Sequence, residues 1–171
     1  MKKYIYTMAL MVATALSLVS CDTETDVKPG GTSVEKMAGT WDVTVTGVDD
    51  QGREVVNFGD ATILTYNTAE NTATKMWLDD QESFWNFKFK VDVAYEQRAF
   101  SCGATSYDAA GTGTAVVTDG KVLEGAATNL HGMPNDSIVF YVDFSDATEY
   151  HEAYGISKFK VSGQRHTGFT E

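Results

Sequence analysis

The chain has 171 residues, of which 24 are acidic and 13 basic, and carries a net charge of −11. So acidic a protein is poorly suited to phosphate backbones, and we expect no nucleic-acid partner. Cys21 and Cys102 are the two cysteines, so the sequence predicts a domain that depends on its core rather than on disulfides.

The first 20 residues have the pattern of a secretory signal peptide. Lys2 and Lys3 precede an apolar run from Met8 to Val19, which is shorter than the roughly 20 residues that span a bilayer. We therefore read residues 1–20 as a leader and not as part of the fold.

Leu18-Val19-Ser20-Cys21 resembles the lipobox of bacterial lipoproteins. In that family the cysteine sulfur is acylated and the cysteine becomes the mature N-terminus, so the resemblance implies lipidation of Cys21 and a membrane anchor. The alternative is a plain signal peptide that is cut elsewhere. The acidic CDTETD after the cut resembles the export tag of Bacteroidetes surface lipoproteins. It implies a cell-envelope location, as an outer-membrane lipoprotein that can reach the cell surface.

Residues 21–33 form a polar segment with Pro29-Gly30-Gly31 and little to bury, which predicts a flexible tether after the lipidated cysteine. Thr32-Ser-Val-Glu35 is a capping box for a short helix, and Gly39 can end it. Residues 34–171 are then one domain.

From Trp41 onward the apolar residues recur with period two. Trp85, Phe87, Phe89, Val91 and Val93 alternate with polar residues, and residues 137–144 repeat the pattern. One apolar and one charged face are typical of an antiparallel sheet that covers an interior on one side only.

Short connections with turn chemistry separate the predicted strands, including residues 49–52, residues 67–71 and Asp119-Gly120, where we expect a hairpin. The candidate strands are 41–48, 53–58, 61–67, 72–78, 84–94, 95–102, 112–118, 121–128, 137–144 and 155–166, some of which can merge. About eight to ten strands without a crossover helix favour an all-β, closed up-and-down antiparallel barrel. A two-sheet sandwich is the alternative.

Gly39-Thr40-Trp41 after a short helix resembles the Gly-x-Trp opening of the lipocalins, and Arg165 stands where that family has its partner arginine. The resemblance implies a lipocalin-like (calycin) barrel in which Arg165 lies over Trp41 and closes one end. With the lipobox, the chain resembles the small lipocalin-like, lipid-binding lipoproteins of the Bacteroidetes, a family whose activity is poorly defined.

Six aromatic residues are predicted to face the interior: Trp85, Phe87, Phe89, Phe100, Phe140 and Phe144. An eight-stranded barrel is either packed with side chains or holds one small ligand. These rings are therefore either core or the lining of an apolar cavity for a lipid or acyl chain. Trp77 has the opposite parity to Met76 and Leu78, so one of these two faces is outside, and an exposed ring at Trp77 is an alternative platform for a sugar.

Catalytic chemistry is hard to find. His131, His151 and His166 lack metal-ligand spacing, and we expect them in loops or at strand ends. Cys102 with His131 or His151 is a conceivable nucleophile and base, but a lone buried thiol is usually a packing group. The acidic pairs at residues 49–50 and 79–80 lack an EF-hand pattern. We assign no catalytic residue, no metal ligand and no cofactor.

Three functions follow as hypotheses. The first is a lipid-anchored, non-catalytic binder of a small hydrophobic ligand inside the barrel. The second is a surface lipoprotein that binds glycans through Trp77 and the aromatics of residues 145–155. The third is a hydrolase with a lipocalin-like fold, which the resemblance allows and the residues support least.

Overall fold

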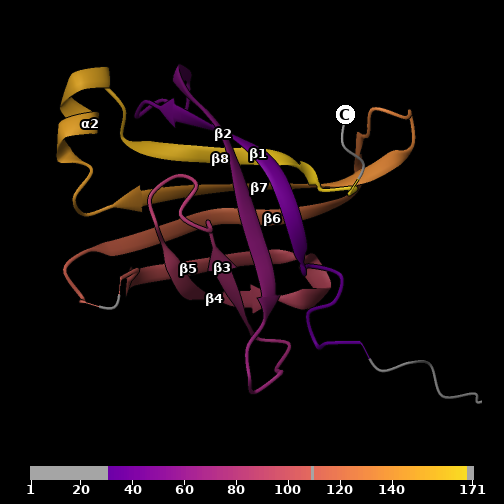
Figure 1. Cartoon of the computed structure of the whole chain (residues 1–171). Coiled ribbons are helices and arrows are strands. Elements are labelled where there is room, and N and C mark those ends of the chain that lie inside the picture. The colour runs from indigo at the N-terminus through magenta and orange to yellow at the C-terminus, as the bar shows by residue number, and fades with distance from the viewer. Residues whose placement is uncertain (1–30, 109, 169–171) are drawn as a thin grey trace, which may run out of the picture. The chain divides into compact units, whose positions relative to one another are not determined.

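The computed structural model describes residues 31–108 and 110–168, which form a closed barrel of eight antiparallel strands in chain order (Figure 1). The strands are β1 (Gly39–Val48), β2 (Glu54–Asn67), β3 (Lys75–Asp79), β4 (Lys88–Ala94), β5 (Ala99–Ser106), β6 (Thr114–Thr128), β7 (Pro134–Phe144) and β8 (Lys158–Arg165). The predicted leader, Cys21 and the predicted tether through residue 30 lie outside the described residues. The prediction of an up-and-down lipocalin-like barrel is confirmed.

The barrel closes because β1 pairs with both its sequence neighbour β2 and the last strand β8. Along the β1–β8 seam Trp41 is opposite Arg165, and Val45 is opposite Val161. Gly163 permits this approach, since a Cβ there would lie 1.9 Å from the carbonyl oxygen of Asp42. Closure gives each of the eight strands a paired neighbour on both sides, which the edge strands of an open sheet lack.

Apolar side chains at every second position of the strands form the interior of the barrel. In β7, Ile138, Phe140, Val142 and Phe144 are buried, while the residues between them are partly exposed. β4 buries Phe89 and Val91 in the same way. Since successive side chains point to opposite faces, each strand contributes one stripe to a common core. Residues 31–168 thus enclose a hydrophobic core of their own.

Two predicted strand pairs are single long strands. Candidates 53–58 and 61–67 merge into β2, and 112–118 and 121–128 merge into β6. The hairpin expected at Asp119-Gly120 is therefore wrong. Asp119 does adopt a positive φ of 55°, but its neighbours continue to pair with β5 and β7, with a register shift between Thr118 and Lys121. The dipeptide makes a β-bulge instead of a turn.

The strand expected over residues 84–94 begins only at Lys88. Residues 80–87 form a loop around Asp80, whose side chain is fully buried. Its carboxylate accepts backbone N–H bonds from Glu82, Phe84, Trp85, Asn86 and Phe87 at 2.7–3.2 Å. Because the carboxylate satisfies five amides, this loop replaces the first half of the predicted strand.

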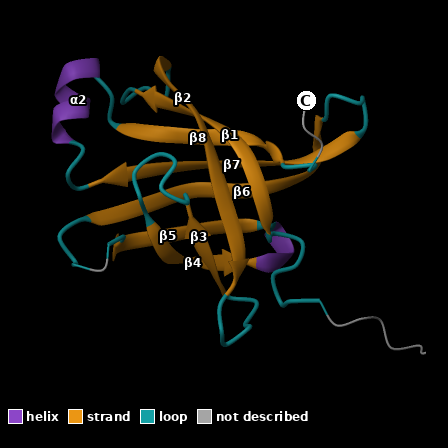
Figure 2. Cartoon of the chain, in the orientation of Figure 1, coloured by secondary structure: helices purple, strands orange, loops and turns teal. Residues whose placement is uncertain are grey.

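Helical structure is sparse, as Figure 2 shows. The expected short helix is a turn over residues 33–37, closed by the N–H groups of Met37 and Ala38 on the carbonyl of Val34. The 3₁₀-helix η1 (Tyr95–Gln97) follows β4, and α2 (Thr148–Tyr154) lies in the segment expected to be a loop. No helix in the described parts of the chain is long and apolar enough to cross a bilayer.

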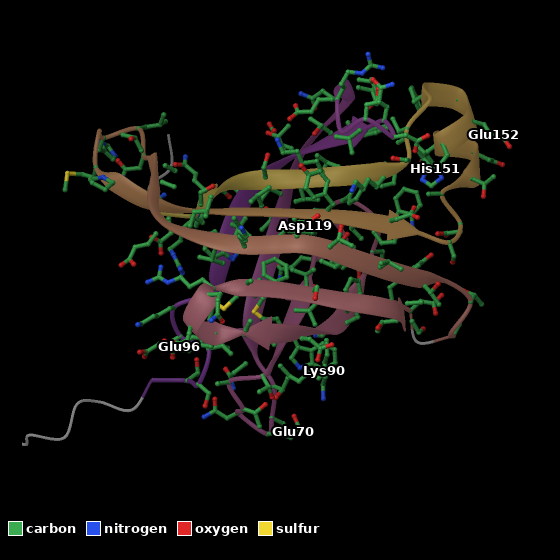
Figure 3. All side chains as sticks on the ribbon, turned by 180° about the vertical axis from the view of Figure 1, so that it is seen from behind. Glu70, Lys90, Glu96, Asp119, His151 and Glu152 are labelled. Carbon is green, nitrogen blue, oxygen red and sulfur yellow. The ribbon has the colours of Figure 1, made fainter. Side chains whose placement is uncertain are left out.

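The two ends of the barrel differ. One end, here the α2 end, carries α2, the β1–β2 turn and the loops of residues 80–87 and 107–113. The other end, here the Trp41 end, carries residues 32–38, η1, and the β2–β3 and β6–β7 turns. Figure 3 places His151 and Glu152 on α2 at one end and Glu96 of η1 at the other.

Candidate functional site

Aromatic side chains gather at the α2 end of the barrel. They come from four strands, two connecting loops and α2, and each contacts another ring of the set at 4.7–6.4 Å between centroids. This aromatic cluster consists of Phe58, Phe84, Trp85, Phe87, Phe89, Tyr107, Phe144, Tyr150, Tyr154 and Phe159. Rings so arranged form an apolar surface of adjustable shape.

Phe144 lies at the centre of the cluster. Trp85 stacks on it with 4.7 Å between ring centroids and 4° between ring planes, and the buried rings of Phe87 and Tyr107 also contact it. Phe144 is only 2% exposed, whereas Trp85 is partly exposed. The cluster therefore runs continuously from the rim of the barrel into its core.

Two aspartates hold the polar edges of the aromatic cluster. Asp80 accepts the backbone N–H of Trp85 at 2.7 Å and so places that residue on the rim. Asp146 accepts the indole N–H of Trp85 at 3.2 Å and the hydroxyl of Tyr107 at 2.6 Å. Burial, followed by the bond to Asp146, raises the pKa of Tyr107, so this hydroxyl remains a donor at neutral pH.

α2 covers the outer side of the aromatic cluster. Tyr150 contacts Trp85 at 5.1 Å and Tyr154 contacts Phe58 at 5.3 Å, yet these tyrosines are 41% and 50% exposed. The helix has seven residues, no side-chain hydrogen bond at its N-cap and no fully buried residue; it ends at Gly155 in the left-handed conformation. A helix this short depends on such contacts for its stability.

The structure splits the six predicted interior aromatics into two groups. Trp85, Phe87, Phe89 and Phe144 belong to the aromatic cluster. The alternation of apolar residues predicts Trp85 on a strand, but this residue lies in the 80–87 loop. Phe100 and Phe140 contact each other at 5.7 Å elsewhere in the core. All except Trp85 are at most 3% exposed, so these five rings are buried in the barrel.

At the Trp41 end the guanidinium carbon of Arg165 lies 4.4 Å from the centre of the Trp41 ring. Nη1 of Arg165 donates to the carbonyl of Ala38 at 2.5 Å, and Nη2 lies 3.2 Å from Asp136. The indole N–H of Trp41 donates to Thr65 at 2.8 Å. These bonds join the start of β1 to the end of β8 and cover this end of the barrel.

The candidate catalytic groups are dispersed. His151 lies on α2 and not in a loop, with Nε2 3.2 Å from Oδ1 of Asp143 but without hydrogen-bond alignment. His166 pairs with Asp42 on the outer surface, and the backbone N–H of His131 donates to Asn129 in the β6–β7 turn. Burial raises the pKa of the Cys102 thiol, which disfavours the reactive thiolate.

Each acidic pair supplies at least one carboxylate that stabilises the fold. Asp49 caps its turn by accepting the backbone N–H groups of Gln51 and Arg53. Asp79 accepts the hydroxyl of Tyr66 at 2.9 Å and lies 3.2 Å from the ammonium of Lys88. Within residues 31–108 and 110–168, no three His, Cys, Asp or Glu side chains are grouped to hold a metal ion.

Trp77 points outward from β3, between the buried Met76 and Leu78. The ammonium groups of Lys88 and Lys90 lie 5.6 Å and 5.2 Å from its ring centre. A sugar stacking on this ring would compete with two cation–π contacts. In the structure Trp77 therefore serves as the aromatic partner of two lysines on the neighbouring strand β4.

Sequence reasoning missed several members of the aromatic cluster, chiefly Phe58, Phe84, Tyr107 and Phe159. Phe159 has the inward parity of β8, so the alternation contained a signal for it. Tyr107 packs on Gly113, where a Cβ would lie 2.4 Å from its ring, and this contact joins the two ends of a loop. Such contacts between loops have no sequence periodicity that could have revealed them.

The comparison with protein families agrees with this site. A family model described as "lipid-binding putative hydrolase" matches residues 26–170. No curated protein matches the chain. A barrel with an aromatic cluster that reaches its rim suits a hydrophobic ligand. The chain belongs to this lipid-binding family.

Proposed function

We propose that the protein is a lipid-anchored, non-catalytic binder of a small hydrophobic ligand, a lipid or an acyl chain, which enters the barrel at the α2 end. The observation that carries the proposal is the continuity of the aromatic cluster from the exposed Tyr150 and Tyr154 to the buried Phe144. Membership of a lipid-binding family supports the same ligand class.

Entry of a ligand requires movement of α2. The inner rings contact one another, so a ligand must displace some of them or take the place of the α2 tyrosines over Phe58 and Trp85. α2 is suited to this because it is short and buries no residue completely. A depression of about 290 Å³, lined by Glu149, Tyr150, Ala153 and Tyr154, marks its outer face.

The test compares two partly exposed tryptophans. A fluorescent long-chain fatty acid is titrated into the protein, and Trp85→Ala is compared with Trp77→Ala. Because Trp85 lines the proposed entrance, its loss should weaken binding by at least about tenfold, while Trp77→Ala should bind like the parent. Native mass spectrometry of the purified protein should also detect a bound lipid. Equal binding by both variants, or no binding by the parent, rules the proposal out.

The same pair of variants distinguishes the glycan-binding hypothesis from the lipid-binding one. If a glycan array gave binding that Trp77→Ala abolished and Trp85→Ala preserved, the protein would be a glycan binder. A hydrolase would instead turn over ester or glycoside substrates and lose activity in Cys102→Ala or His151→Ala. The raised pKa of Cys102 disfavours only a hydrolase that uses this thiol as its nucleophile.

The anchor is tested by metabolic labelling with a fatty-acid analogue. Cys21→Ser should lose the label, whereas Cys102→Ser should keep it, because a thiol buried in the core is not available for acylation. Label that persists in Cys21→Ser would show that this cysteine is not the site of lipidation.

A further inference from the structure

The hairpin at the β6–β7 turn presents two large apolar side chains to solvent. Leu130 is 68% exposed and Met133 is 60% exposed, more than any other large hydrophobic residue in the part of the chain that the structure describes. Exposed apolar groups at the tip of a projecting element are unfavourable in water and indicate an interaction surface.

Local hydrogen bonds fix the tip in this conformation. Oδ1 of Asn129 accepts the N–H groups of His131 and Met133 at 3.1 Å and 2.9 Å. The N–H of Asn129 donates to the carbonyl of Met133 at 3.0 Å, and Gly132 supplies a φ of 76°. Leu130 and Met133 thus lie on a turn whose backbone conformation is fixed by hydrogen bonds.

The hairpin extends past the barrel at the Trp41 end. The last β7–β8 pair is Ser137 with Gln164, whereas β6 and β7 continue to pair as far as Thr128 and Pro134. Figure 1 shows the two strands running beyond the end of β8. The tip therefore lies beyond the part of the hairpin that pairs with β8.

Charge is absent from this part of an acidic protein. Residues 125–135, GAATNLHGMPN, contain no Asp, Glu, Lys or Arg, although 22% of the chain is charged. The two flanking carboxylates are paired, Glu124 with Arg98 at 2.6 Å and Asp136 with Arg165 at 3.2 Å. Apart from His131, the tip can therefore approach a low-dielectric phase without bringing an ionisable side chain into it.

The tip lies at the Trp41 end of the barrel, where the described part of the chain also begins with residues 31–38. Arg165 joins this first segment to the hairpin, since it donates to Ala38, which follows the 33–37 turn, and pairs with Asp136. Fully extended, the segment from Cys21 to Gly31 reaches at most about 35 Å. A lipid on Cys21 would thus hold the Trp41 end near the bilayer.

We propose that the β6–β7 tip, with Leu130 and Met133, inserts into the surface of the lipid bilayer and orients the barrel with its α2 end away from the membrane. This proposal rests on one part of the proposed function, the lipid anchor at Cys21, which determines that the Trp41 end faces the membrane. The contact itself requires no ligand in the barrel. Two apolar side chains give weak, reversible attachment that an excess of vesicles detects without the anchor, and an anchor that keeps the domain at the surface strengthens it.

The first experiment measures flotation with uncharged vesicles of phosphatidylcholine and phosphatidylethanolamine. It uses residues 21–171 with Cys21→Ser, because the barrel encloses its own core. The double variant Leu130→Ser/Met133→Ser should reduce the vesicle-bound fraction at least about fivefold. Val55→Ser is the matched control, since Val55 is 48% exposed at the α2 end, and it should float like the parent. Equal flotation of all three proteins, or none by the parent, overturns the proposal.

The second experiment determines which end touches the vesicle. A polarity-sensitive fluorophore is attached in Leu130→Cys and, separately, in Val55→Cys, while the buried Cys102 stays unlabelled. Vesicles should shift only the emission at position 130 to the blue. A shift at 130 that depends on protein concentration and not on vesicles would identify a second copy as the occupant and contradict the proposal. Fatty-acid binding at Trp85 is unaffected by either outcome, so failure here is distinguishable from failure of the ligand hypothesis.

Discussion

Arg165 and Trp41, from opposite ends of the domain sequence, face each other across the β1–β8 seam, with the guanidinium carbon 4.4 Å from the centre of the indole. The same arginine bonds Ala38 and pairs with Asp136. One side chain thus links three parts of the Trp41 end.

Removing the two partners should therefore be non-additive. Trp41→Ala removes a fully buried indole and should cost about 3–5 kcal/mol of unfolding free energy. Arg165→Ala should cost less, because the indole stays packed. We expect the double variant to be less destabilised than the sum of the singles by at least about 0.5 kcal/mol, as measured by urea unfolding. Strict additivity would show that the contact contributes nothing.

Gly163→Ala should destabilise the barrel at its seam. The added Cβ would lie 1.9 Å from the carbonyl oxygen of Asp42 and 2.5 Å from the Cα of Val43, and both are backbone atoms that cannot rotate away. We expect a loss of at least about 2 kcal/mol in thermal or urea unfolding. Gly103→Ala in β5 is the control: its Cβ would meet nothing within 4 Å, so a comparable loss there would refute the steric argument.

Asp80→Asn should loosen the loop that carries Trp85. The amide group can replace only one carboxylate oxygen as an acceptor, and it places N–H groups against backbone N–H groups. We expect a loss of at least about 2 kcal/mol and a red-shifted tryptophan emission. Asp50→Asn, in the exposed β1–β2 turn, should behave like the parent. An unchanged emission spectrum in Asp80→Asn would mean that other contacts position Trp85.

Asp79 should make stability depend on pH in the acidic range. Burial acts to raise its pKa, but the bonds from Gln81, Tyr66 and Lys88 outweigh burial and lower it below 3.8. A lowered folded-state pKa stabilises the fold above pH 3.8, and this contribution is lost as the pH falls through the folded value. Asp79→Asn should therefore cost about 1 kcal/mol at pH 7 and less below pH 3.8. A cost that did not decline with pH would assign the effect to shape and not to charge.

The sequence was sufficient to predict the barrel class. Period-two alternation is a local property of the chain, so the apolar stripes of β7 and most of β4 followed from residue order alone. The pairing of Trp41 with Arg165 was implied by a family resemblance, because it joins strands whose sequence separation leaves no local signal.

Tertiary structure decided the turns and the site. Asp119-Gly120 has the backbone preference of a hairpin, but pairing on both sides with β5 and β7 makes it a bulge. In the sequence Asp80 is an ordinary turn residue, whereas in the structure five backbone N–H groups donate to its carboxylate. α2 is too short to show a helical period, and ring contacts with Phe58 and Trp85 hold it. Periodicity reports which face of a strand is buried, whereas the assembly of loops depends on groups distant in sequence, and only the closed barrel brings these together.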